Sequence, residues 1–180
     1  MKLSDERYEE IKNIVADIFV KLNISHTPIN GFEIARKLNI HVIPYSSCKS
    51  PKKLIEINED GICIEDKTGV LYIFYNDNKS IERINWTILH EIGHIVLGHS
   101  EHCSLAEAEA DFFAKFAIAP PVIIAHYNPS TIKEMQTIFC ISREAAFNSL
   151  IYYHKWLKIP NLKPYDIKLL VLFGFKTHKK

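Results

Sequence analysis

The sequence predicts an α+β protein in which a small, mainly antiparallel sheet lies beside helices and a further helical region follows. Two changes of pattern along the chain support this fold class. Short apolar runs separated by the turn signals Asp60-Gly61 and Thr68-Gly69 predict strands in the first part of the chain. From about Ser80 the apolar residues instead recur at helical spacing, and this pattern continues through most of the remaining sequence.

The elements before Ser80 follow from periodicity and turn signals. They are a helix over residues 5–22, a second helix over 31–38, an extended stretch over 40–45, a surface loop over 46–53, and a meander of strands over 54–58, 62–65 and 70–75. The last of these strands directly precedes the longest helical pattern. If it forms a sheet edge, it could hold a substrate as an added strand.

The elements after Ser80 are expected to be mainly helical. They are a helix over about 80–98, a helix from 104 to about 119 that ends at two prolines, two helices between 131 and 157 with a break near Cys140, and a helix or strand over 169–175. We therefore expect one domain over residues 1–128 and a helical C-terminal region over residues 129–180.

Composition limits the classes of partner and the compartment. The chain of 180 residues has a formal net charge of +1, which gives no electrostatic argument for nucleic acid as the main partner. No apolar run is long enough to cross a membrane. The mostly charged N-terminus does not resemble a signal peptide, and none of the four cysteines forms a C-x-x-C pair. We expect a cytoplasmic protein with reduced thiols.

The strongest chemical motif is His-Glu-Ile-Gly-His at residues 90–94. On a helix, residues four apart lie about 40° from each other around the axis, so His90 and His94 present two imidazoles on one face. This arrangement suits two ligands of one tetrahedral zinc ion. Glu91 lies about 100° around the helix from His90, where it could take a proton from the attacking water. The motif predicts a zinc-dependent peptidase.

The third metal ligand is open to alternatives. One family of zinc peptidases uses a histidine six residues after the second one, with a glycine between them, but this chain has Ser100 and Leu97 at those positions. His99 comes one residue too early and would point roughly opposite His90 in a continuous helix. A break at Gly98 would change its direction, so His99 is kept as a minor alternative.

The next predicted helix offers the preferred third ligand. Glu107 and Asp111 lie four residues apart on one face, so Glu107 can complete a His₂Glu set and leave the fourth position open. Asp111 can accept a hydrogen bond from the free ring nitrogen of a liganding histidine. Glu109 points elsewhere and is a weaker candidate. Ser104-x-x-Glu107 is also a capping-box pattern, in which Glu107 would have no metal role.

The segments His90–His99 and Glu107–Ala114, together with Pro120, resemble the ImmA/IrrE family of metallopeptidases. The approach to the motif, Asn85–His90, and the N-terminal segment Pro28–Ala35 are also similar to that family. The resemblance implies a minimal zincin-like core. It also implies that His90, His94 and Glu107 bind zinc and that Glu91 activates water. The family often has Asn where this chain has Asp111.

The resemblance further implies a protein substrate, since the best understood members cleave a helix-turn-helix repressor encoded by a phage or mobile element. An alternative is a module that binds a repressor or DNA without cleavage. Residues 131–153 resemble a helix-turn-helix with Arg143 near the start of its second helix, although Glu134 and Glu144 dilute any basic patch. The oxyanion-stabilising group is not identified; His102, His126 and Tyr127 are candidates.

Overall fold

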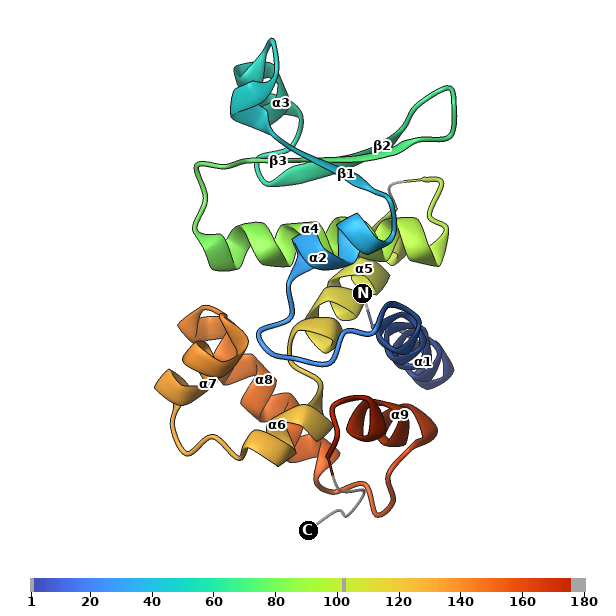
Figure 1. Ribbon diagram of the computed structural model, residues 1–180, viewed down its shortest axis with the longest axis vertical. Coiled ribbons are helices and arrows are strands. Elements are labelled where there is room, and N and C mark those ends of the chain that lie inside the picture. The colour runs from blue at the N-terminus through green and yellow to red at the C-terminus, as the bar shows by residue number, and fades with distance from the viewer. Residues whose placement is uncertain (1, 102, 176–180) are drawn as a thin grey trace. The chain divides into compact units, whose positions relative to one another are not determined.

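The computed structural model describes residues 2–101 and 103–175 and divides into two compact units (Figure 1). Asn30–Ala114 forms most of the first unit, whereas Leu3–Ile29 and the chain from Lys115 onward form the second. This division follows spatial proximity, which is a different criterion from the expected functional boundary between residues 128 and 129. That functional boundary stays a prediction.

The first unit consists of a small sheet, one long helix and supporting helices. Its elements are α2 (Gly31–Lys37), β1 (His41–Pro44), the 3₁₀ helix η1 (Tyr45–Ser47), α3 (Pro51–Ile57), β2 (Gly61–Glu65), β3 (Leu71–Tyr75), α4 (Ile81–Leu97) and α5 (Ser104–Ile118), which continues into the second unit. The strand order is β1-β3-β2, with β1 parallel and β2 antiparallel to β3. The sheet lies along one side of α4, and α5 crosses the opposite side (Figure 1).

Helix α4 is buried over most of its circumference because other elements of the unit pack around it. Both β2 and β3 contact it, and α2 packs closely beside it. At this last contact, Oδ1 of Asn85 accepts a 2.7 Å hydrogen bond from the backbone N–H of Gly31. A Cβ atom at Gly31 would lie 2.9 Å from Cγ2 of Ile88, so only glycine fits this close approach without a shift.

The expected strand over residues 54–58 is wrong, so the expected meander is reduced to the antiparallel pair of β2 and β3. Pro51–Ile57 forms α3 instead, with Pro51 in the first turn, where a proline needs no hydrogen-bonded N–H. None of the residues of α3 is buried, and Ile57 is 71% exposed, so the short apolar run does not form a half-buried strand. The expected loop over 46–53 is also partly helical, because η1 and α3 extend into it.

The second unit is helical. Its elements are α1 (Asp5–Leu22), the end of α5, α6 (Pro121–Tyr127), α7 (Ile132–Phe139), α8 (Arg143–Trp156) and α9 (Pro164–Leu172). Helix α1 packs against α9, and α7 packs against α8 after a turn at Cys140 with a φ of 50°. The expected break near Cys140 is therefore confirmed, the tail forms a helix, and α6 was not anticipated.

The two units together confirm the α+β fold class and the helical C-terminal region. The sheet is mixed, because β1 joins β3 in the parallel direction through the intervening α3 and β2 segments. Within the described residues, no helix combines the length and apolar character needed to span a membrane.

Candidate metal centre

The two histidines of α4 meet at their Nε2 atoms. Ser80 caps the helix by accepting a hydrogen bond from the N–H of Arg83, and the helix then continues without interruption to Leu97. His90 and His94 are therefore one turn apart on one face, with their Nε2 atoms 3.1 Å from each other. Both rings are buried, at 8% and 3% exposure, which limits their rotation.

Helix α5 brings a carboxylate to the same point. Oε2 of Glu107 lies 3.3 Å from Nε2 of His90, and its Oε1 lies 3.4 Å from Nε2 of His94. One potential ligand atom from each of these residues lies within 4.8 Å of the others. Ser104 is the first residue of α5, and the carboxylate of Glu107 faces the imidazoles.

Gly93 permits the close approach of α5 to α4. A Cβ atom at this position would lie 3.2 Å from Cα of Ala110 and 3.2 Å from Cβ and Cδ1 of Phe113. The middle of the His-Glu-Ile-Gly-His motif therefore needs a residue without a side chain, because α5 packs directly on it. No role for Gly93 was predicted from the sequence, although its position between the two histidines was the available signal.

The donor atoms are close enough to share one metal ion. The two Nε2 atoms are 3.1 Å apart, and the two oxygens of Glu107 approach one histidine each, at 3.3 and 3.4 Å. With one atom taken from each residue, the three donors lie within 4.8 Å of one another. Two imidazoles and one carboxylate are also a donor set that zinc enzymes use while keeping a position open for water. Side chains of Glu107 and Asp111 are 49% and 43% exposed, which leaves one side accessible.

Asp111 lies behind His90, on the far side of the ring from the donor cluster. Its Oδ1 is 3.1 Å from Nδ1 of His90. A carboxylate in this position favours a proton on Nδ1 and so leaves the lone pair of Nε2 for a metal ion. This placement matches the position predicted for Asp111, and its role in orienting the ligand stays a prediction.

Glu91 is a buried carboxylate beside this cluster. It is 5% exposed, and its Oε2 atom has no hydrogen-bond partner among the described residues. Burial raises the pKa of Glu91, while the nearby His90 and hydrogen bonding with Cys63 act in the opposite direction. A carboxylate with a raised pKa and a vacant acceptor atom is suited to receive a proton at neutral pH.

Cys63 of β2 is a neighbour of Glu91 that the sequence analysis did not identify. Burial and the Glu91 carboxylate raise the pKa of Cys63 to about 12, so the thiol stays protonated at neutral pH and donates to Glu91. In this state the thiol is a hydrogen-bond donor and not a nucleophile. All four cysteines are free, and Cys103 is the exposed one.

The charge of the cluster favours a cation. Burial opposes protonation of His90, but the carboxylates of Asp111, Glu91 and Glu107 outweigh it, so that the pKa of His90 is raised. A buried site that draws a proton onto an imidazole in this way would equally attract a divalent metal ion, which competes with that proton for the same lone pair.

Trp86 and Arg83 lie one after the other beside the His90 ring. The Trp86 ring lies 5.0 Å from the His90 ring, and the guanidinium of Arg83 lies 4.5 Å from the Trp86 ring. Arg83 is in turn fixed by two hydrogen bonds to the carboxylate of Asp60, one of 2.9 Å from its Nε. These residues were also missed, because their link depends on the turn before β2 lying next to α4.

The minor alternative for the third ligand, His99, does not lie at the donor cluster. Its Nδ1 is 2.9 Å from Nδ1 of His94, on the side of that ring away from the cluster. Gly98 ends α4 with a φ of 72°, and this turn carries His99 back toward His94. Glu109, the weaker candidate for a ligand, is 3.0 Å from Nε2 of His99.

A cavity of about 530 Å³ adjoins the metal centre. Part of its lining comes from β2, including Cys63 and Ile64, and part comes from His94 and His99 at the end of α4. The condition under which residues 70–75 could hold a substrate, a position at the sheet edge, is not met, because β3 is central. Strand β2 is an edge, so its outer backbone groups are the ones that could pair with an added strand.

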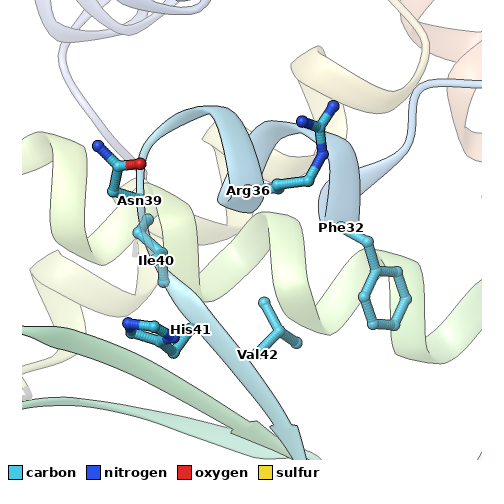
Figure 2. Close-up of a pocket in the computed structure, with 6 residues that line it drawn as sticks. All are labelled: Phe32, Arg36, Asn39, Ile40, His41 and Val42. Atoms are coloured by element: carbon cyan, nitrogen blue, oxygen red, sulfur yellow. The ribbon is translucent and has the colours of Figure 1, made fainter.

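A second cavity of about 350 Å³ lies between α2 and the other edge strand, β1 (Figure 2). Figure 2 shows Phe32 and Arg36 on α2 and His41 and Val42 on β1 around it. None of the predicted site residues lines this cavity. Among the described residues that line it, Arg36 carries a permanent positive charge, and the cluster of potential metal ligands found in the described chain lies elsewhere.

The candidates for oxyanion stabilisation have no established role. His126 and Tyr127 lie in α6 of the second unit, where the His126 ring stacks on Phe175 with their centroids 3.3 Å apart. His102 lies outside the described residues. The assignment of an oxyanion group stays a prediction.

Two histidines one helical turn apart, a buried glutamate between them in sequence and a glutamate from the next helix form an arrangement that is compatible with a zincin-like centre. Residues 35–120 match the family model Peptidase_M78, described as the IrrE N-terminal-like domain. The resemblance to ImmA/IrrE metallopeptidases is confirmed, and the matched segment contains every candidate ligand. A comparison with curated proteins gives no significant match.

Proposed function

We propose that this protein is a zinc-dependent endopeptidase that cleaves a helix-turn-helix repressor and thereby derepresses genes of a phage or mobile element. The observation that carries the catalytic part is the convergence of His90, His94 and Glu107 within 4.8 Å of one another, beside a buried Glu91. The match to a metallopeptidase family supports the same class of reaction.

His90, His94 and Glu107 would hold the metal ion, and Asp111 would orient the His90 ring. A zinc ion bound there would lower the pKa of a water ligand and polarise the scissile carbonyl. Glu91 takes a proton from the attacking water at its vacant Oε2 and later passes it to the leaving amine. The Cys63 thiol donates to the Glu91 carboxylate and limits its rotation.

The cavity beside β2 supports an extended peptide as substrate. A peptide that pairs with the outer edge of β2 would run along the wall formed by Cys63 and Ile64 and reach the metal centre near His94. Pairing with a strand edge requires an unfolded segment of the substrate, so a linker or exposed loop fits and a folded helix does not. A repressor would therefore be cut between its folded parts.

The test is incubation of the purified protein with the repressor encoded beside its gene, with zinc or with a chelator. A discrete product that disappears on chelation and returns with added zinc is the expected result. A stable complex without any product would instead favour a module that sequesters the repressor. Failure to bind zinc at all would contradict the catalytic proposal directly.

A DNA-binding role has weaker support. Helices α7 and α8 have the two-helix arrangement expected from the sequence, and Arg143 is exposed at the start of α8. Phe147 and Ile151, however, expose apolar surface on α8, at 54% and 42%. A gel shift at moderate salt, repeated with Arg143→Ala, would detect such binding, and we expect none.

A further inference from the structure

We propose that His99 and Glu109 form a relay that fixes the tautomer and orientation of His94, and that this relay tunes the affinity of the metal centre. The inference rests on the proposed metal-dependent function and assigns positioning roles to two residues outside the proposed ligand set. The chain of contacts runs from Glu109 through His99 to Nδ1 of His94.

The hydrogen-bond donors in this chain follow from elementary chemistry. The Glu109 carboxylate can only accept, so Nε2 of His99, 3.0 Å away, carries the hydrogen. The other nitrogen of a neutral His99, Nδ1, is then an acceptor. His94 must therefore donate to it from its own Nδ1 across 2.9 Å, and this leaves the lone pair of Nε2 facing His90 and Glu107.

The relay is largely buried, so competition from solvent for these hydrogen bonds is limited. Glu109 is 6% exposed, and the side chain of His99 is 11% exposed. Hydrogen bonds in such a largely buried position have a larger effect than the same contacts would have at the surface. His94 itself is 3% exposed.

The turn after α4 builds this geometry. The backbone N–H of His99 donates a 3.0 Å hydrogen bond to the carbonyl of His94, which is possible because Gly98 adopts a left-handed conformation. A continuous helix would direct His99 to another side. Helix α5 supplies Glu109, two residues after Glu107 in the sequence, so that one helix provides a ligand and the end of the relay.

The two liganding histidines are thus supported in different ways. Asp111 approaches Nδ1 of His90 directly, at 3.1 Å, whereas His99 stands between His94 and its carboxylate. An interposed imidazole transmits the preference for one tautomer while it keeps the negative charge of Glu109 farther from the ion. The acidic segment Glu107-Ala-Glu-Ala-Asp111 therefore has three separate roles for its three carboxylates.

The test is the zinc affinity of the full chain, measured by competition with a chromophoric chelator. Loss of a group behind a liganding histidine commonly lowers metal affinity about 10–100-fold, and we expect this for His99→Ala and, as a comparison, for Asp111→Asn. His99→Asn retains an acceptor near the place of Nδ1 and should recover part of the affinity. Glu109→Gln should lower the zinc affinity less than His99→Ala does, because the amide oxygen can still accept the hydrogen bond from His99.

A second readout separates positioning from a general structural role. In ¹H–¹⁵N spectra of the zinc-loaded protein, the Nδ1–H of His94 should be protected from exchange, and this signal should broaden in His99→Ala. His154→Ala and Glu144→Gln, at exposed positions of α8, are matched controls that should change neither readout.

The outcomes distinguish the relay from the function on which it rests. If the wild-type protein binds no zinc, the proposed function fails and the relay fails with it. If the wild type binds zinc and both His99→Ala and Glu109→Gln bind it equally well, only the relay is wrong. A proton on Nε2 of His94 in the metal-free protein would also overturn it. If His99→Ala does not fold, as judged by circular dichroism, Glu109→Gln is the deciding variant. A zinc affinity equal to that of the wild type would then show that the relay is wrong.

Discussion

At the scale of single residues, Glu91 differs most from an ordinary surface carboxylate. Its position in the motif, next to His90, predicted a general base. The sequence could not show how the side chain is held. The structure buries it against Cys63 and leaves one oxygen without a partner among the described residues. These two features together, and not the motif alone, describe a group prepared to accept a proton.

Glu91→Gln should therefore abolish cleavage while preserving the fold and zinc binding. The amide has nearly the same shape but cannot take a proton, and loss of a general base commonly lowers rates about 10²–10⁴-fold. The measurements are the cleavage rate of a confirmed substrate, zinc content and thermal unfolding. Cleavage at the wild-type rate would mean that another group is the base, and a loss of zinc would mean that Glu91 is a ligand.

The Asp60–Arg83 pair should make stability depend on pH. The hydrogen bonds from Arg83 hold the pKa of Asp60 below its usual value of 3.8, so the charged form favours the folded state. This contribution is complete above about pH 3.8 and disappears as the pH falls through the lower pKa of the folded protein. Because the pair is partly exposed, we expect about 1 kcal/mol or less.

Denaturant unfolding of Asp60→Asn and wild type between pH 2 and 7 tests this expectation. The difference in the free energy of unfolding should be largest near neutral pH and should shrink on acidification, as far as both proteins remain folded. A difference that stays constant over the whole range would show that Asp60 acts through its backbone turn rather than through its charge.

At the scale of elements, glycines decide how closely the helices approach α4. Gly93 admits α5, Gly31 admits α2, and Gly98 ends the helix. Helices α4 and α5 were predictable because their apolar residues recur at helical spacing over a long stretch of sequence. Helix α3 was not, since a short apolar run fits a strand or a helix equally well and only its neighbours decide.

Gly93→Ala should weaken zinc binding about 10-fold. This is the lower end of the range of about 10–100-fold that is usual when the groups supporting metal ligands are disturbed. The new methyl group would press on Ala110 and Phe113, whose nearest atoms lie 3.2 Å away, and would displace the helix that carries Glu107. Crowding of this kind costs about 1–3 kcal/mol, which exceeds the gain of up to about 1 kcal/mol from better helix propensity. Zinc affinity and thermal unfolding are the measurements.

Gly31→Ala is the matched control for Gly93→Ala. It crowds α4 from the side of α2, where its Cβ atom would lie 2.9 Å from Cγ2 of Ile88. We expect a similar loss of stability with little change in zinc affinity. If both variants lowered the affinity equally, the effect would come from general loosening of α4 and not from the position of α5.

At the scale of the whole molecule, ligands from two helices couple metal binding to folding. The donor set of α4 and α5 exists only when the unit Asn30–Ala114 is folded. Zinc should therefore stabilise the protein by an amount that grows with its free concentration, about 2.7 kcal/mol at 100 times the dissociation constant. The second unit supplies none of the described ligand atoms.

Thermal unfolding with and without zinc should show this coupling. In a hydrogen-exchange experiment, added zinc should increase protection first in α4 and α5. Glu107→Gln should reduce the zinc-dependent rise in the unfolding temperature, whereas Glu144→Gln should leave it unchanged. A rise of equal size in Glu107→Gln would place the third ligand elsewhere.

The sequence by itself determined the α+β class, the long helix with its His90–His94 pair and the acidic helix with Glu107, because each depends on spacing within one element. Only the tertiary structure decided that β2 is the edge beside the centre, that Cys63 meets Glu91 and that His99 lies behind His94. These contacts join elements distant in sequence or depend on one turn at Gly98. Periodicity within an element carries no information about such contacts, because packing between elements creates them.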